Sequence, residues 1–371
     1  MKSLVPGVVL ALCLSCITPV NLDPAEPEDI LAVDGFITDQ EGPFEIIIQL
    51  ISRFAGTLDG GTERLIKDAE VFITDQNGTR IDMNIIPLIR QEVRNGCPTG
   101  CCSIASTFET ESIGYRTPMG FRAVIGNSYT LNIILANGKR YQSSAQTVVP
   151  GPEIDSLSYR FRELPTTDPI VKPSGIDVFA TWEDPSETRN FYSWRVNGIY
   201  RIETPPNDGC CVYIPGGNGA VCYINERNIE GNELAFSDER VQGMVTHKVG
   251  FIQDDGLRFA NRTVGDERQY YIEVEQFAIP GEAFAFNRVL ASQLAISGSI
   301  FDPPPAELIG NIRNLDDPDE PVVGFFGAYS VKTMGIFVNR GDLDFIQRNP
   351  RPCGDCRVRR GARSEVPEVY R

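Results

Sequence analysis

The chain has 371 residues, of which 42% are hydrophobic, and its 34 basic and 50 acidic side chains give a formal net charge of −16. An acidic surface repels phosphate backbones and anionic headgroups, which argues against binding to nucleic acid or directly to a membrane surface. The hydrophobic content is enough for packed cores, and the length predicts two domains and a tail.

The first sixteen residues predict an exported, lipid-anchored protein. Lys2 precedes an apolar run that is too short to span a bilayer and that ends at Ser15 and Cys16. A small residue before cysteine resembles the signal of bacterial lipoproteins, although Cys13 stands where leucine is usual. We therefore expect residues 1–15 to be a signal peptide and Cys16 to carry the lipid. Ordinary secretion and an uncleaved anchor are the alternatives.

Residues 16–29 predict a tether between the lipid and the fold, because they hold three prolines and four acidic side chains. Acidic residues after the lipidated cysteine also resemble the export signals of surface lipoproteins in Bacteroidota, although Asp23, the first of them here, stands further from the cysteine. No later apolar stretch approaches the ~20 residues that crossing a bilayer requires, so the lipid is the expected membrane attachment.

Residues 30–150 predict an antiparallel β-sandwich. Hydrophobic residues alternate with period two, 44–51 is a strongly apolar strand, and the Asn-Gly pairs at 77–78 and 137–138 are typical of tight hairpin turns. The stretch of roughly 84–120 predicts a long polar excursion between the hairpins. It carries the first cysteines, and a disulfide would pin it.

Residues 151–345 predict a second β domain, which begins after the break at Val149-Pro150-Gly151-Pro152. A tryptophan, a Pro-containing turn and an aromatic strand between 182 and 196 resemble the fibronectin type III pattern. The strands expected are 154–162, 176–182, 190–196, 245–252 and 270–277, with a last pair between 322 and 338. Apolar residues at four-residue spacing predict an amphipathic helix over 282–296.

Residues 346–371 form an arginine-rich tail. Its arginines are Arg348, Arg351, Arg357, Arg359, Arg360, Arg363 and Arg371. Such a run predicts a solvated, disordered segment, and a docking strip for an acidic partner is the alternative.

Eight cysteines besides Cys13 and Cys16 are disulfide candidates. They are Cys97, Cys101, Cys102, Cys210, Cys211, Cys222, Cys353 and Cys356. An even number in an exported chain predicts disulfides in preference to metal, and the spacing leaves their connectivity open. Cys353 and Cys356 have the CxxC spacing of redox proteins without a βαβ context, so a small disulfide ring is expected ahead of redox or metal chemistry.

No catalytic centre, metal site or cofactor site emerges from the sequence, and we expect a protein that is not an enzyme. His247, the single histidine, lies in an alternating strand, which favours a polar-face position over catalysis or zinc binding. The acidic segment 316–320 predicts a solvated turn in preference to a calcium loop. A glycosidase-like carboxylate pair depends on three-dimensional separation, and nothing in the sequence singles one out.

Recognition is predicted for the loop 204–224, which combines glycines with the second group of cysteines. Tyr200, Tyr213 and Tyr223 lie in or beside this loop. Tyrosines on a disulfide-stiffened loop make a suitable contact surface for a peptide, a glycan or a protein.

Four groups of segments carry a resemblance to a known family. They are 31–39 (LAVDGFITD), 69–75 (AEVFITD) leading to 129–131 and 138–141, 182–185 (WEDP) with 190–195 (NFYSWR), and 270–274 (YYIEV) continuing to 310–314 (GNIRN). Their order and spacing resemble the Bacteroidota lipoproteins grouped as domain of unknown function 4249. The resemblance covers most of the mature chain and implies exported lipoproteins, often encoded beside TonB-dependent outer-membrane receptors. It supplies no catalytic residue, and it makes the first domain similar to transthyretin-like or Ig-like sandwiches.

The resulting hypothesis is a non-enzymatic outer-membrane lipoprotein that assists a TonB-dependent β-barrel receptor in ligand capture or complex assembly. Its expected partners are that receptor and, through acylated Cys16, the outer-membrane lipid bilayer, at the periplasmic face or the cell surface. No nucleic acid and no cofactor are expected. A surface adhesin or glycan-binding module is the first alternative, and a carboxylate-dependent hydrolase is the second.

Overall fold

The structure is a computed structural model of the chain. The residues it describes are 29–52, 64–92, 108–167, 173–185, 188–204, 220–227, 234–239, 243–254, 258–259, 268–294, 308–339, 356 and 361–371. The predicted signal peptide, Cys16, Cys97, Cys101, Cys102, Cys210, Cys211, Tyr213 and Cys353 lie outside these residues. No helix within the described part is long and apolar enough to span a bilayer.

Three sheets make up the described fold. The large sheet has the order β20 (Ala362–Arg363), β14 (Ala220–Glu226), β13 (Phe191–Thr204), β17 (Arg268–Ala278), β19 (Val322–Asn339), β1 (Asp29–Thr38), β2 (Glu45–Ser52), β7 (Phe108–Arg116) and β6 (Asn84–Glu92), with β15 (Phe236–Ser237) beside β13 and β3 (Arg64–Leu65) beside β2. The second has β18 (Ile312–Asn314), β9 (Arg140–Ser143), β8 (Ser128–Ile134), β4 (Glu70–Asp75) and β5 (Arg80–Asp82), with β10 (Gln146–Thr147) beside β8. The third has β11 (Ile154–Glu163), β12 (Ser174–Asp184) and β16 (Gly243–Gln253).

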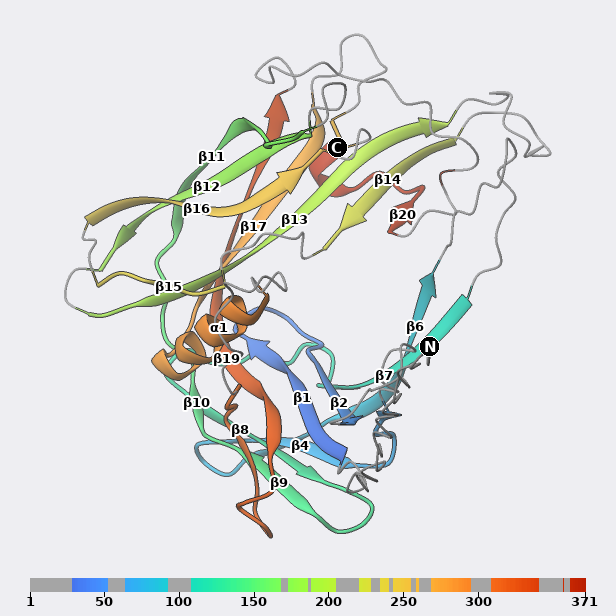
Figure 1. The fold of residues 1–371 in the computed structure, drawn as a ribbon, viewed down its shortest axis with the longest axis vertical. Coiled ribbons are helices and arrows are strands. Elements are labelled where there is room, and N and C mark those ends of the chain that lie inside the picture. The colour runs from blue at the N-terminus through green and yellow to red at the C-terminus, as the bar shows by residue number, and fades with distance from the viewer. Residues whose placement is uncertain are drawn as a thin grey trace, which may run out of the picture.

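The large sheet is the common layer of two sandwiches (Figure 1). The second sheet covers its β1–β2 half around a core that includes Leu31, Ile48 and Leu131. The third sheet covers its β13–β17 half around a core that includes Trp182 and Trp194. The prediction of a mainly β chain built from sandwiched sheets is confirmed, while the likeness to transthyretin-like and fibronectin-like domains stays a prediction.

Strand β19 belongs to both sandwiches and runs from the lower half of Figure 1 into the upper half. Its first part pairs in parallel with β1, from Leu31 opposite Val322 to Thr38 opposite Tyr329. Its second part pairs antiparallel with β17. The predicted strand pair between 322 and 338 is therefore wrong, because the chain does not turn back there. The predicted division at residue 150 stays a prediction, and the segment from β18 into β19 contributes to the first core.

The two Asn-Gly hairpins form as predicted. Gly78 and Gly138 have φ angles of 80° and 90°, which glycine adopts at little cost. They connect β4 to β5 and β8 to β9. The excursion expected over 84–120 is different, because β6 and β7 within it pair along their length as a third hairpin. β7 carries Glu109, Thr110, Glu111 and Ser112 in succession, so its sequence shows no apolar pattern that would predict a strand.

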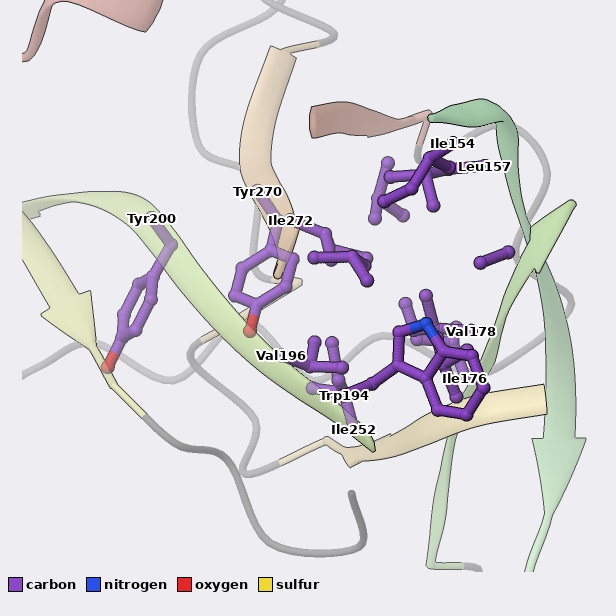
Figure 2. Packing of buried hydrophobic residues seen from close by; sticks show 14 of the residues in the cluster. Ile154, Leu157, Ile176, Val178, Trp194, Val196, Tyr200, Ile252, Tyr270 and Ile272 are labelled. Atoms are coloured by element: carbon purple, nitrogen blue, oxygen red, sulfur yellow. The ribbon is translucent and has the colours of Figure 1, made fainter. Parts of the chain in front are cut away.

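The second core is built around two tryptophans. Trp194 extends from β13 toward Ile176 and Val178 of β12, as Figure 2 shows. Its ring centroid lies 5.3 Å from that of Trp182, and both side chains are at most 1% exposed. The indole Nε1 of Trp194 donates a hydrogen bond of 3.0 Å to Gln276, so this buried polar group is satisfied.

Helix α1 (Gly281–Leu294) agrees closely with the predicted helix over 282–296. It covers the junction of the two sandwiches, where Ala283 is fully buried. Phe284 stacks on Phe191 with ring centroids 4.6 Å apart, and Phe286 lies 5.1 Å from Phe325. The aromatic contacts bury the apolar face of the helix against strands from both halves.

The C-terminal tail is folded where the structure describes it, which corrects the prediction of a disordered segment. Residues 362–363 add strand β20 to the edge of β14, and 368–370 form the 3-10 turn η3. Tyr370 packs against Tyr223 and Phe337, with ring centroids 5.1 and 5.4 Å away. Pairing, aromatic contacts and a disulfide from Cys222 to Cys356 outweigh the solvation that the arginines favour.

We expect loss of the Cys222–Cys356 disulfide to destabilise the fold by about 3–5 kcal/mol, because the bond closes a loop with a sequence separation of 134 residues. The double variant Cys222→Ala/Cys356→Ala, in which no free thiol remains at either position, should show this loss in urea unfolding. Peptide mapping without reduction should recover the two cysteines linked. Recovery of a Cys353–Cys356 ring would contradict the assignment.

Candidate functional site

Of the eight cysteines predicted to form disulfides, Cys222 and Cys356 are the two that the structure describes. Cys222 and Cys356 are both fully buried and bonded to each other. This bond excludes the small ring between Cys353 and Cys356, since each cysteine can form one disulfide. The spacing of a local CxxC pair could not reveal a partner that lies on another strand.

The predicted tyrosine contact surface is not formed by the residues described. Tyr200 and Tyr223 are 4% and 7% exposed, so both rings pack inside the protein. Tyr200 faces Tyr270 in the second core, and Tyr223 lies beneath Tyr370 of the tail. Tyr200 lies on the inner face of β13, in the second core, and Tyr223 lies on the outer face of β14, where Tyr370 covers it, which explains the burial.

His247 also departs from its predicted position on a polar face. On β16 its side chain lies on the same face as those of Val245 and Val249, which are buried. The centre of its ring lies 4.4 Å from that of Phe236 and 5.7 Å from that of Trp194. The histidine therefore belongs to the aromatic packing of the second sandwich.

The acidic segment 316–320 is a solvated turn, as predicted. Asp316 receives the Arg140 guanidinium at 2.6 Å, and Glu320 receives Lys139 at 2.7 Å. Hydrogen bonds from Arg140 lower the pKa of Asp316, because they stabilise its charged form. No group of three His, Cys, Asp or Glu side chains suited to a metal ion occurs within the residues described.

A polar hollow lies on the face of the large sheet that points away from the second core. Its volume is about 210 Å³, and the residues that line it are Arg195, Asn197, Ile199, Asn225, Arg227, Glu273 and Glu275. Alternation along the strands places it there, because Trp194 and Val196 of β13 and Val274 of β17 point into the core. We refer to it as the outer-face hollow.

Cross-strand pairing sets the arrangement inside the outer-face hollow. Arg195 stands directly opposite Glu275, and Asn197 stands opposite Glu273. On the far side of Glu273, β19 presents Gly335, and the Tyr271 ring occupies the place that a side chain there would take. Directly opposite residues of an antiparallel pair lie on the same face, so these groups form adjacent rows.

The charges in the hollow are balanced across the strands. Arg195 lies 3.5 Å from Glu275, and the Asn197 amide donates to the same carboxylate at 3.2 Å. Burial and the nearby Glu275 raise the pKa of Glu273, while a hydrogen bond from Asn197 and the charge of Arg227 oppose the rise. Each carboxylate therefore has a basic neighbour, and Glu273 is the more costly one to keep ionised.

Aromatic rings border the hollow at both ends. At one end Tyr370 donates a hydrogen bond of 2.8 Å to the carbonyl of Ile199, and the rings of Tyr271 and Phe337 lie 5.0 Å apart beside it. At the other end the Arg195 guanidinium lies 5.1 Å from the ring centre of Phe36. The hollow is thus a polar strip between two apolar margins.

The sequence analysis missed this hollow. Its signal was present in the run Tyr270–Phe277, where Glu273 and Glu275 alternate with apolar residues and must share one face of a strand. The partners could not be found in that way, since Arg195 and Asn197 are about 80 residues away along the chain.

A second polar cluster lies at the end of the second sandwich and is buried. Tyr192 donates a hydrogen bond of 2.9 Å to Asp184, and the backbone N–H of Asn190 donates to Asp238 at 2.8 Å. Burial raises the pKa of Asp184, the hydrogen bond from Tyr192 lowers it, and the charge of Asp238 raises it again. The cluster ties β12, β13 and the β15 region together, which is a structural role.

Comparison with known families gives one match. A family model described as "Domain of unknown function (DUF4249)" matches residues 17–334. This range includes every strand that contributes to the outer-face hollow except the C-terminal end of β19. No curated protein matches the chain.

The raised pKa of Asp184 predicts a stability that declines with pH. A carboxyl that holds its proton more tightly when folded contributes most below the ordinary value of 3.8, and the contribution is lost as the pH rises through the folded pKa. Asp184→Asn keeps an oxygen for Tyr192 and removes the titration, so its stability relative to the unsubstituted protein should increase from pH 4 upward. Urea unfolding at several pH values checks this.

The matched control for this experiment is Asp155→Asn, because Asp155 is exposed on β11. Its pH profile should run parallel to that of the unsubstituted protein. Parallel profiles for Asp184→Asn as well would contradict the expected linkage.

Proposed function

The chain belongs to the family described as domain of unknown function (DUF4249), and from this membership we propose that it is a non-enzymatic outer-membrane lipoprotein of the Bacteroidota type. In this proposal the acyl chains on Cys16 hold the protein in the outer membrane, where it assists a TonB-dependent β-barrel receptor. It does so by capturing a ligand or by assembling the complex.

The observation that carries the proposal is the shared strand β19. It joins two sandwiches through one hydrogen-bonded sheet, with α1 packed across the junction. A body of this kind can hold a binding surface at a fixed orientation, since little conformational freedom is left to lose on binding. That property suits a protein that holds a ligand-binding surface toward a receptor.

The position of the anchor supports the same proposal. The first strand begins at Asp29, so residues 17–28 would separate it from the lipid on Cys16. Twelve extended residues span at most roughly 40 Å, which would keep the sandwiches close to the membrane. Confinement of this kind raises the local concentration near a receptor and substitutes for high intrinsic affinity.

Two further observations agree with export and with a role other than catalysis. A fully buried disulfide is typical of proteins that mature in an oxidising compartment. The single histidine packs among aromatic rings, in a position that serves the core.

Acylation of Cys16 is the first test of the proposal. Metabolic labelling with a palmitate analogue is expected to mark the full-length chain and to leave a Cys16→Ala variant unmarked, because only the thiol can carry the thioether-linked lipid. Cys13→Ala is the matched control and should label like the unsubstituted chain. Equal labelling of the Cys16 variant would contradict the anchor.

Association with a receptor is the second test. Affinity purification of the acylated chain from membranes in a mild detergent should recover a β-barrel outer-membrane receptor. The Cys16→Ala chain should recover much less of it, since the local concentration is lost. Purification that yields the intact lipoprotein without any β-barrel protein would contradict the proposed partner.

A further inference from the structure

We propose that the outer-face hollow is a binding site for an uncharged, hydroxyl-rich ligand, a saccharide. This inference rests on the proposed function only in that it names the class of ligand that the lipoprotein would capture. Seven side chains line the outer-face hollow, and they come from β13, β14, β17 and the residue that follows β14.

The first step is the charge of the lining. Two arginines and two glutamates stand in the hollow, so their charges cancel. Arg195 lies opposite Glu275, and Arg227 acts on Glu273, so each charge has its counter-charge nearby. An anion that approached an arginine would also meet a carboxylate, and a cation would meet a guanidinium, which removes the gain from charge attraction.

The second step is the chemistry of the hydrogen-bonding groups. Arginine supplies only donors, ionised glutamate supplies only acceptors, and asparagine supplies both. Both asparagines, Asn197 and Asn225, lie between the charged rows or next to them. A hydroxyl group can donate to a carboxylate and accept from a guanidinium or an amide at once, so adjacent hydroxyls on a sugar ring match this lining.

The third step is the apolar margin. Tyr271, Phe337 and Tyr370 form a continuous series of ring contacts at 5.0 and 5.4 Å along one edge, and all three rings are partly exposed. Aromatic rings offer flat apolar faces, on which the C–H face of a sugar can pack while its hydroxyls reach the polar rows. Ile199 lies between the two kinds of surface.

The fourth step is size. At about 210 Å³ the hollow is smaller than the ~300–1,000 Å³ typical of pockets that enclose a drug-sized molecule. It therefore takes one or two sugar rings, or a short part of a longer glycan that continues across the open sheet. Weak binding follows from this shallow contact, and a lipid-anchored protein can use weak binding.

Saturation-transfer NMR on the folded chain tests the proposal, with maltose, cellobiose and xylobiose as neutral probes. Glucuronic acid, glucosamine and the dipeptide Gly-Gly are the charged or zwitterionic comparators. We expect saturation transfer to at least one neutral disaccharide, with an affinity that does not change between ~50 and ~500 mM NaCl, because no net charge is neutralised. We expect none of the comparators to bind more tightly.

The variants are Asn197→Ala, which removes a donor at the centre of the hollow, and Arg227→Ala, whose exposed position makes folding insensitive to the change. Each should weaken the binding about tenfold. Asn132→Ala is the matched control, because Asn132 occupies the outer face of β8 in the first sandwich. It should bind as the unsubstituted chain does.

Three outcomes would overturn the inference: no neutral saccharide binds, a charged or zwitterionic comparator binds more tightly, or both hollow variants bind with unchanged affinity. Recovery of a β-barrel receptor with the Asn197→Ala chain separates this result from the proposed function. If the receptor is recovered and no sugar binds, the saccharide inference fails alone. If sugar binds and no receptor is recovered, the proposed partner fails alone.

Discussion

The parallel pairing of β1 with β19 is the contact on which the rest of the fold depends. It joins residues near position 30 to residues near position 325, and it makes the two sandwiches share one sheet. The approach is close: a Cβ on Gly324 would overlap the carbonyl oxygen of Val33, and the φ of +114° at this residue is one that glycine tolerates. Beside it the Asn311 amide donates to and accepts from the backbone of Phe326, at 2.8 and 2.9 Å. A buried side chain thus completes the hydrogen bonding where the strands alone would not.

The outer-face hollow is a consequence of that shared strand. Because β19 continues beyond β1 and pairs with β17, the sheet has a face beside Glu273 that neither sandwich covers. The Tyr271 hydroxyl lies over Gly335, and a Cβ at that position would overlap the hydroxyl oxygen. The tail then closes the upper margin through Tyr370, and the Cys222–Cys356 bond fixes the start of that tail. The extent of the outer-face hollow is therefore set by β19 with its Gly335, by Tyr370 of the tail and by the disulfide that fixes the tail.

Local patterns predicted local structure well. The two Asn-Gly hairpins and the helix over 281–294 depend on residues a few positions apart, and the sequence showed them directly. Features that depend on distant residues could not be predicted in this way. The apolar stretch between 322 and 338 was predicted to be a pair of strands, and it is one long strand whose two parts pair with different neighbours. Tyr200 and Tyr223 appeared suited to recognition until strands and tail from elsewhere in the chain covered them. The partner of Cys356, the arginine opposite Glu275 and the arginine whose charge acts on Glu273 are non-local for the same reason.

The two glutamates of the hollow are arranged differently from a carboxylate pair that cleaves a glycosidic bond. A pair of carboxyl groups that cleaves a glycosidic bond needs one group protonated and one ionised, held on either side of the bond. Glu273 and Glu275 instead follow one another on the same face of one strand, and Asn197 donates to Glu275 from the neighbouring strand. Burial and the nearby Glu275 raise the pKa of Glu273, while a hydrogen bond from Asn197 and the charge of Arg227 oppose the rise. Arg195 lies 3.5 Å from Glu275 on the neighbouring strand. A neutral, prearranged set of donors and acceptors favours selectivity with modest affinity, and the proposed lipid anchor would make modest affinity sufficient.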